Sequence, residues 1–207
     1  ITVNWHHIVG VREGNQLKLY IDGKGISTSI TDYGGLDISL NLLAAAEYNE
    51  GTIQNYFNGA IDEIRYTPES RTPAWINASY HNHYTEEFID LDPEELLGEP
   101  WNGTWAYRTN ITINHDYVNS ELDNFTLLVP LSSPDFNYTH SEPDGADIRF
   151  TDSNNEELYY EIEEWNPSGE SIVWVRAPSI NSSVDTVLNL YHGNPRASHK
   201  QNPEGLW

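Results

Sequence analysis

Cysteine and methionine are both absent from this sequence of 207 residues. Without cysteine, the chain has no disulfide bond, no thiolate metal ligand and no cysteine nucleophile. No apolar run approaches the roughly 20 residues that a membrane-spanning helix needs, and the first residues lack the charged and then apolar regions of a signal peptide. We therefore expect a soluble chain, and its beginning is compatible with excision from a longer secreted protein.

Basic residues are scarce, with 10 Lys and Arg against 32 Asp and Glu, which gives a formal charge of -22 and a pI near 4.4. A surface of this charge repels nucleic-acid phosphates and anionic lipid headgroups, so we expect neither nucleic acid nor a membrane as a partner. Salt or bound calcium relieves such self-repulsion, although a merely solvated acidic surface explains the composition equally well.

Apolar residues alternate with polar ones along most of the chain, which is the pattern of half-buried antiparallel strands. Clusters of Gly, Pro, Asn and Asp between these stretches are typical of turns. We expect strands at residues 17–21, 36–42, 105–113, 148–150, 158–162, 172–175 and 184–191. Many short strands at this spacing predict an all-β chain built as a sandwich or barrel.

One segment has helical character, residues 72–80. Thr72 is a suitable N-cap, Pro73 suits the first helical position, and Ile76 and Tyr80 share one face. The acid-dense stretch 86–100 follows and predicts a linker that lies along one domain's surface, because its apolar residues disfavour disorder. We therefore divide the chain into a first domain at 1–85, a linker at 86–100 and a second domain at 101–207.

Three phrases occur in order in the first domain: Trp-His-His-Ile-Val at 5–9, Leu-Lys-Leu-Tyr-Ile-Asp-Gly-Lys at 17–24, and Phe-Asn-Gly-Ala-Ile-Asp-Glu-Ile-Arg at 57–65. Together they resemble the C-terminal half of a laminin-G-like, concanavalin A-like jelly-roll domain. The resemblance implies a Trp-His strand, a Tyr-x-Asp-Gly hairpin and a Gly-x-Ile-Asp-Glu strand. Residues 70–82 resemble the short helix that closes this module in secreted prokaryotic surface proteins.

The second domain carries its own set of phrases, at residues 105–108, 144–152, 160–165, 173–175 and 191–195. Over nearly its whole length it is similar to the domain-of-unknown-function 2341 family, which commonly sits next to laminin-G-like modules. The resemblance implies an extracellular, often archaeal or bacterial, surface location and supplies no proven chemistry. The expected architecture is thus a partial antiparallel β-sandwich or jelly roll, followed by a second β-sandwich domain.

About half of a jelly roll is missing before the Trp-His phrase, so we expect the first domain to expose an open sheet edge. Such an edge is a template for added strands. We expect these strands to come from other copies, as in a fibre, or from a missing part of the same polypeptide. The chain also stops where this family pairing would start a fresh laminin-G-like strand, which is compatible with a repeating array.

Six Asn-x-Ser/Thr sequons occur, about twice the number expected by chance, and they suggest a glycosylated exterior protein. The predicted glycosylation sites are Asn77, Asn102, Asn110, Asn124, Asn137 and Asn181.

Oxygen ligands for calcium cluster at Asp144, Asp147, Asp152, Asn154 and Glu156. Calcium prefers such ligands on a loop, but the glycine and the distal glutamate of the EF-hand pattern are lacking, and Asp and Asn are also ordinary turn residues. Calcium is the one cofactor that we consider, and both interpretations stay open.

Catalytic signals are weak, and we assign no catalytic residue. Glu161 and Glu163 share a strand face, as the carboxylates of retaining glycanases do, but acid-rich strands produce such pairs freely. Asp62 and Glu63 are adjacent and point to opposite faces. The His6-His7 pair and the His81-x-His83 motif are more readily structural than metal-binding.

Aromatic side chains offer flat surfaces on which the C–H faces of sugars stack. Trp165 precedes a Gly- and Pro-containing loop, so we expect it to be exposed and to bind carbohydrate. Our leading hypothesis is a non-enzymatic, glycosylated cell-surface protein with a structural or adhesive role, repeated or polymerised into a fibre or coat. The alternatives are a carbohydrate-binding module for adhesion and, less favoured, a glycanase fragment.

Overall fold

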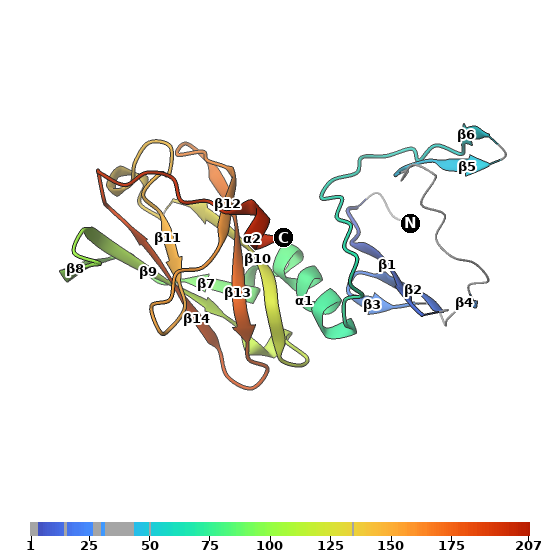
Figure 1. Cartoon of the computed structure of the whole chain (residues 1–207), viewed down its shortest axis with the longest axis horizontal. Helices are drawn as coiled ribbons and strands as arrows, with labels where there is room; N and C mark the ends of the chain where they lie inside the picture. The colour runs from blue at the N-terminus through green and yellow to red at the C-terminus, as the bar shows by residue number, and fades with distance from the viewer. Residues whose placement is uncertain (1–3, 15, 27–29, 32–43, 50, 134) are drawn as a thin grey trace.

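The structure is a computed structural model that describes residues 4–14, 16–26, 30–31, 44–49, 51–133 and 135–207. It is built from antiparallel strands, which confirms the all-β prediction. Two β-rich units lie on either side of a single long helix (Figure 1). Among the described residues, none of the helices has the length and apolarity needed to cross a bilayer.

The first unit is a small antiparallel sheet. Its strands are β1 (Ile8–Glu13), β2 (Gln16–Ile21), β3 (Lys24–Gly25) and β4 (Ile30–Thr31), in the order β1-β2-β3, with β4 also paired to β2. A separate hairpin joins β5 (Glu47–Asn49) to β6 (Thr52–Gln54). The strand predicted at 36–42 from Leu36, Ile38, Leu40 and Leu42 lies outside the described residues.

The Tyr-x-Asp-Gly hairpin is confirmed by the pairing of β2 with β3. Ile21 faces Lys24 in the ladder, so Asp22 and Gly23 form a two-residue turn. Both turn residues have positive φ, 50° and 72°, which matches the twist that tight hairpins require. A side chain at Gly23 would also meet the backbone of α1, because an added Cβ would lie 3.2 Å from Cα of Asn77.

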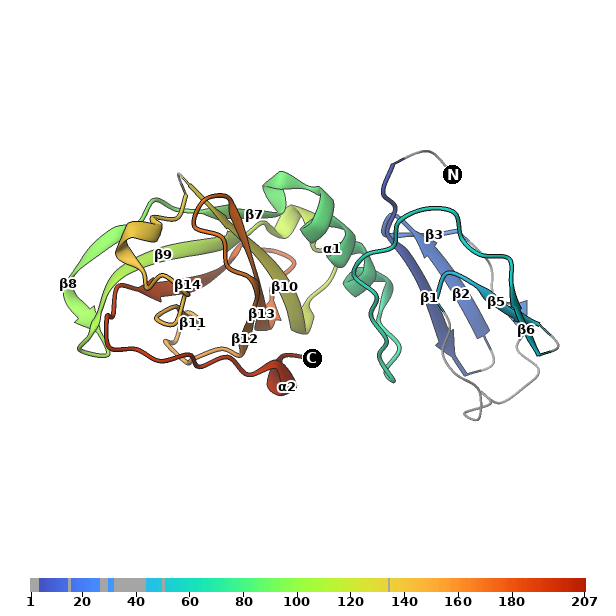
Figure 2. The same cartoon turned by 90° about the horizontal axis from the view of Figure 1, so that it is seen from above.

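The second unit is a sandwich of two antiparallel sheets (Figure 2). One sheet has the order β10 (Leu122–Ser132), β13 (Glu170–Ile180), β12 (Tyr160–Glu164). The other has the order β11 (Arg149–Thr151), β14 (Thr186–His192), β9 (Trp105–Ile113), β7 (Ile89–Leu91), and β8 (Glu95–Trp101) also pairs with β9. The short helices η1 (Glu86–Phe88), η2 (His115–Tyr117), η3 (Tyr138–His140) and α2 (Pro203–Leu206) connect or end these strands.

Alternate residues of strands from both sheets form the core of the sandwich. Phe125, Leu127 and Val129 of β10 are fully buried, as are Ile111 and Ile113 of β9. The alternation of β9 is the one read from the sequence, whereas no strand was expected at residues 122–132. In both strands one face packs inward while the other is covered less completely.

Residues 86–100 differ from the linker that we expected. Ile89–Leu91 and Glu95–Trp101 are strands, and both pair with β9. Phe88, just before them, is fully buried in the core of the sandwich. The acidic side chains of this segment are explained by its position at the edge of the sheet, because one face and the outer edge of these strands are exposed to solvent.

Helix α1 (Pro73–Tyr84) joins the two units. Thr72 caps it as predicted, because its side chain accepts a hydrogen bond from the Trp75 N–H at 3.1 Å, and the helix extends one turn further than expected. Ile76 packs with Val11 and Tyr20 of the first unit. On another face, Ala78 belongs to the core of the sandwich.

The outer edge of β10 is blocked in two ways. Asn82 of α1 accepts a hydrogen bond from the Leu128 N–H at 2.7 Å and donates one to the Leu128 carbonyl at 3.0 Å. Two residues further along the strand, Pro130 has no N–H to present. The helix and the proline together close an edge that would otherwise attract another strand.

Replacing Asn82 with alanine is expected to lower the free energy of unfolding by about 1–3 kcal/mol, because the Leu128 N–H is left without its partner in a largely buried place. Urea unfolding measures this loss. The control is Asn119→Ala, which removes an exposed hydrogen bond to Asn77 and should cost no more than about 0.5 kcal/mol. Equal losses in the two variants would contradict the role of Asn82.

Candidate functional site

The first unit buries very little apolar surface. Its described core consists of Val11, Tyr20 and Ile76, with Val9 packed beside them. Many of its larger apolar side chains are exposed to solvent instead: Trp5, Ile8, Leu17, Leu19, Ile26, Ile53, Tyr56, Phe57, Ile61, Ile64 and Tyr66. So many exposed large apolar side chains in one small unit are compatible with a place where another molecule binds or where further chain packs.

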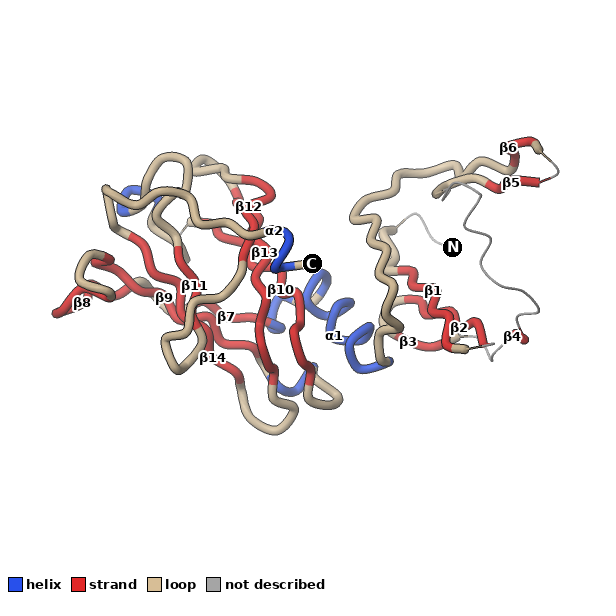
Figure 3. Tube along the Cα trace, in the orientation of Figure 1, coloured by secondary structure: helices blue, strands red, loops and turns tan. Residues whose placement is uncertain are grey.

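The predicted Gly-x-Ile-Asp-Glu strand is not a strand in the structure. Residues 57–66, which we call the unpaired segment, run as a loop (Figure 3) and form no ladder with any described residue. Ile64 and Tyr66 are 64% and 73% exposed. Glu63 has a φ of 52°, and its N–H donates to the Asp62 carboxylate. The strand phrase is present in the sequence, but no described strand pairs with it.

Among the described strands, β2 is the sole partner of β1, so no described strand covers the other edge of β1, which we call its open edge. The Asp22 N–H donates to the His7 carbonyl at 2.8 Å, so these residues form a hydrogen-bonded pair of the ladder. Such pairs recur at every second residue. Val9 and Val11 therefore direct their N–H groups to β2, and Gly10 directs its own to the open edge.

Arg65 attaches the unpaired segment to the second unit. Its guanidinium lies over the rings of Trp174 and Trp207, at 4.1 and 5.0 Å from their centroids. Glu63 pairs with the same guanidinium at 2.8 Å. Cation–π contacts of this kind hold one end of the segment while its apolar residues stay exposed.

The two carboxylates that share a face of β12 are bonded to these indoles. The Trp174 indole N–H donates to Glu163 at 2.5 Å, and the Trp207 indole N–H donates to Glu161 at 2.7 Å. Their shared face is as predicted, and each carboxylate already serves as an acceptor for a tryptophan.

The histidines singled out in the sequence lie close to α1. His6 Nδ1 is 2.9 Å from the Asp22 carboxylate, and His7 stacks on His83. Burial lowers the pKa of His7 and of His83 below the ordinary value. Within the described part of the chain, no three His, Asp or Glu side chains are grouped so that they could hold a metal ion.

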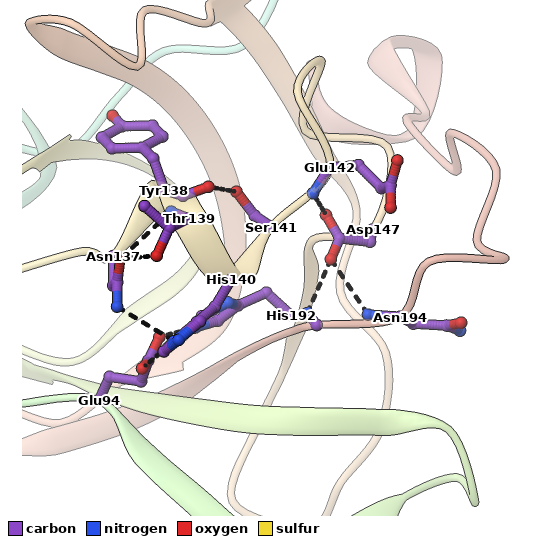
Figure 4. Close-up of polar contacts among 11 residues, drawn as sticks. Glu94, Asn137, Tyr138, Thr139, His140, Ser141, Glu142, Asp147, His192 and Asn194 are labelled. Atoms are coloured by element: carbon purple, nitrogen blue, oxygen red, sulfur yellow. Dashed lines mark hydrogen bonds and ion pairs between the residues drawn. The ribbon is translucent and has the colours of Figure 1, made fainter.

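Glu94, His140 and His192 form a polar cluster at one end of the sandwich that was not predicted from the sequence (Figure 4). One oxygen of Glu94 is 2.6 Å from His140 Nδ1, and the other is 3.1 Å from His192 Nε2, without hydrogen-bond alignment in the second case. Tyr107 stacks on the His140 ring at 4.2 Å. His192 belongs to a phrase quoted above, but nothing near Glu94 or His140 in the sequence signals their meeting.

His192 is fully buried, and burial lowers its pKa, against the opposing effect of the negative charges of Glu94 and Asp147. The imidazole is therefore neutral at neutral pH. The cluster ties together the segment before β8, helix η3 and the end of β14.

The five predicted calcium ligands do not form one site. Asp147 is buried, and its carboxylate accepts hydrogen bonds from the N–H groups of Glu142, Gly193 and Asn194 at 2.7–3.1 Å. Asp144 accepts from the Ala146 N–H and lies 3.2 Å from His199. These carboxylates hold loops, which is the alternative that the sequence left open.

The other predicted calcium ligands form a turn. Asp152 accepts hydrogen bonds from the backbone N–H groups of Asn154 and Glu156, at 2.8 and 2.9 Å. This is the local turn chemistry of aspartate.

Trp165 is not the exposed aromatic that we predicted. It is half-buried against the sandwich core, with edge contacts to Phe136 and Tyr138. A Cβ at Gly145 would lie 2.8 Å from its ring, so glycine is needed for this close packing. The loop beside Trp165 indicated exposure. Gly145 is far from Trp165 in the sequence, so the sequence pattern does not predict their contact.

The six sequon asparagines differ in their surroundings. Asn102 and Asn124 are exposed and have left-handed backbones, with φ of 48° and 52°. The Asn110 amide donates to Asp92 at 3.0 Å, and the Asn137 amide nitrogen is 3.1 Å from His140 Nδ1. The half-buried members are Asn77, Asn110, Asn137 and Asn181.

Comparison with known families finds one match in each half of the chain, in the expected order. Residues 2–77 match the model of the concanavalin A-like lectin/glucanases superfamily, and residues 144–206 match a domain of unknown function (DUF2341). The resemblances drawn from the sequence are therefore confirmed. The first family holds both lectins and glucanases, so the match assigns neither activity. No curated protein and no solved structure matches the chain.

Acid is expected to destabilise the second unit below the ordinary histidine pKa of 6.5, because the unfolded chain then takes up a proton that buried His192 does not. The loss from this one group is at most about 1.36 kcal/mol per pH unit and stops below its folded pKa. His192→Gln should reduce the slope of unfolding free energy against pH in urea titrations. His115→Gln is the control, because hydrogen bonding to Asp185 raises the pKa of His115 and its removal should leave the acid loss as large or larger. An unchanged slope in His192→Gln would exclude this origin.

Proposed function

We propose that this protein is a non-catalytic structural or adhesive protein of the cell surface, and that copies of it assemble by β-strand pairing. The chain combines a concanavalin A-like lectin/glucanase-type domain with a domain of unknown function. Laminin-G-like domains are commonly extracellular, which supports the surface location. The observation that carries the assembly proposal is the first unit, whose apolar side chains and β1 edge have no described cover.

A second copy fits this opening because the chain carries both halves of a contact. The open edge of β1 offers N–H and C=O groups to a strand. The unpaired segment offers strand-forming apolar residues, among them Ile61 and Ile64, that no described strand uses. If the segment of one copy pairs with β1 of the next, the contact joins two different surfaces and extends into a filament.

The charge of the chain opposes this assembly. Each copy carries a formal charge of -22, so neighbours repel each other at low ionic strength. Salt shortens the range of this repulsion from roughly 30 Å at 0.01 M to about 3 Å at 1 M. Assembly should therefore become stronger as salt is added. An association driven by attraction between opposite charges would instead become weaker.

Gly10→Pro tests the edge. The proline removes an N–H that points away from β2 and so imitates Pro130 on the blocked edge of β10. We expect the variant to stay monomeric in sedimentation velocity at high salt, where the unaltered chain forms oligomers, with an apparent dissociation constant at least about tenfold weaker.

Gly98→Pro is the matched control, since Gly98 also lies in a strand and a Cβ there meets nothing within 4 Å. It belongs to the second unit and should leave assembly unchanged. Assembly that survives Gly10→Pro, or an unaltered chain that stays monomeric at all salt concentrations, would refute pairing between copies. If the chain stays monomeric but binds a different polypeptide at this edge, the partner of β1 is that polypeptide and not a second copy.

Glycosylation of a surface protein should follow the exposure of its asparagines. We expect Asn102 and Asn124 to carry glycans most often, because both are exposed, and Asn110 and Asn137 least often, because their amide nitrogens are engaged. Glycopeptide mass spectrometry of protein from its native source measures the occupancy of each site. The opposite order of occupancy, or no glycan at any site, would contradict this prediction.

A further inference from the structure

A pocket of about 440 Å³ lies beside the turn between β8 and β9 in the second unit. Its volume falls within the range of roughly 300–1,000 Å³ that small-molecule sites occupy. The residues that line it are Trp101, Asn102, Asn155, Glu156, Glu157 and Lys200. They come from three separate parts of the chain, and neither the calcium nor the Trp165 prediction includes Trp101 or Lys200.

The aromatic wall of the pocket is held firmly. The Trp101 ring stacks on Tyr191 with centroids 4.4 Å apart and planes 12° apart, and it contacts Trp105 edge-on at 5.2 Å. Tyr191 is buried, and its hydroxyl donates to the Asn155 side chain at 3.1 Å. One face of the indole is thus covered by tyrosine, and the same tyrosine orients a polar group of the rim.

The polar rim is fixed by its backbone. The Glu156 N–H donates to the Asp152 side chain, and its carbonyl accepts from the Asp152 N–H at 3.0 Å. The Glu156 carboxylate has no hydrogen bond to any described residue, whereas Glu157 is paired with Lys200. Asn102 and Asn155 occupy left-handed backbone positions. Asn102 lies within the turn between β8 and β9, and the Asn155 N–H closes a turn on the Asp152 carbonyl at 3.1 Å.

This combination matches the chemistry of a sugar ring. An indole supplies a surface for the C–H face of a pyranose, and amides and a free carboxylate bond its hydroxyl groups. Two carboxylates against one ammonium leave a net negative charge in the pocket, and the whole chain carries -22. Uronic acids, sulfated sugars and phosphates are therefore repelled. We propose that this pocket binds a neutral pyranose residue of a glycan.

The proposal does not rest on the assembly of copies or on the concanavalin A-like match, which covers residues 2–77 and not this pocket. Two sources supply the same chemistry: a glycan on another molecule, and a glycan attached to Asn102, which lies on the rim itself. The experiment separates them by using protein with and without attached sugar.

Protein made in a host without N-glycosylation is titrated with neutral, uronic and sulfated oligosaccharides, and binding is followed by chemical-shift changes. We expect neutral sugars alone to bind, with dissociation constants of about 1 mM, as suits one exposed pocket. Trp101→Ala should weaken binding by at least about tenfold, and Glu156→Gln by a few-fold. Because the Glu156 side chain is exposed and its carboxylate has no hydrogen bond to a described residue, Glu156→Gln should fold normally and keeps the test valid if Trp101→Ala fails to fold.

Tyr159→Ala is the matched control, since Tyr159 is a half-exposed aromatic residue outside the pocket. The affinity of this variant for neutral sugars should equal that of the unaltered protein. The proposal is overturned if no neutral sugar binds, if charged sugars bind as well, or if Tyr159→Ala matters as much as the two pocket variants.

Glycosylated protein and its Asn102→Asp variant identify the source. Asp tolerates the left-handed backbone and removes the sequon. If the attached glycan fills the pocket, added sugar binds to the variant and not to the glycosylated protein. If both bind added sugar equally, the pocket serves glycans of other molecules. Either result supports the pocket once the unglycosylated protein binds, and failure of that protein to bind refutes it.

Discussion

Backbone pairing at sheet edges is the constraint on which this structure depends. An extended chain presents N–H and C=O groups that must be paired, hydrated or covered. The second unit meets this requirement at β10, where Asn82 engages Leu128 and Pro130 lacks a donor. The first unit has no equivalent device on β1 within the described residues. The same molecule therefore holds one edge that is blocked against strands and another for which no described residue provides such a block.

The contrast between the two units extends to their cores. The sandwich buries side chains from strands of both sheets, and many of them have no exposed surface. It therefore resembles an independent domain with its own core. The hydrophobic core of the first unit has three buried residues among those described, one of which, Ile76, belongs to the helix shared with the sandwich. Since hydrophobic burial is the main favourable term in folding, stability of the first sheet depends on what covers it.

Much of the fold could be predicted from the sequence. Alternation and turn residues located β9, β11, β12, β13 and β14 of the sandwich but not β7, β8 or β10, and Thr72 with Pro73 located the start of α1. The acidic composition of residues 86–100 led to the wrong prediction of a linker, because edge strands and linkers are both exposed to solvent and both therefore carry charged residues. The local turn chemistry of Asp152 was an open alternative, whereas the burial of Trp165 against Gly145 and the meeting of Glu94 with His140 depend on tertiary contacts. Residues distant in sequence leave no periodic signal of such contacts.

Helix α1 also has a mechanical consequence. It packs Ile76 into one unit and Ala78 into the other, and its Asn82 is bonded to the backbone of β10. Tension applied to the first sheet, as on a tether at a flowing surface, would reach the sandwich through this helix and through the Arg65 contacts with Trp174 and Trp207. The force would then be shared by several contacts in parallel instead of acting only on the polypeptide that connects the two units.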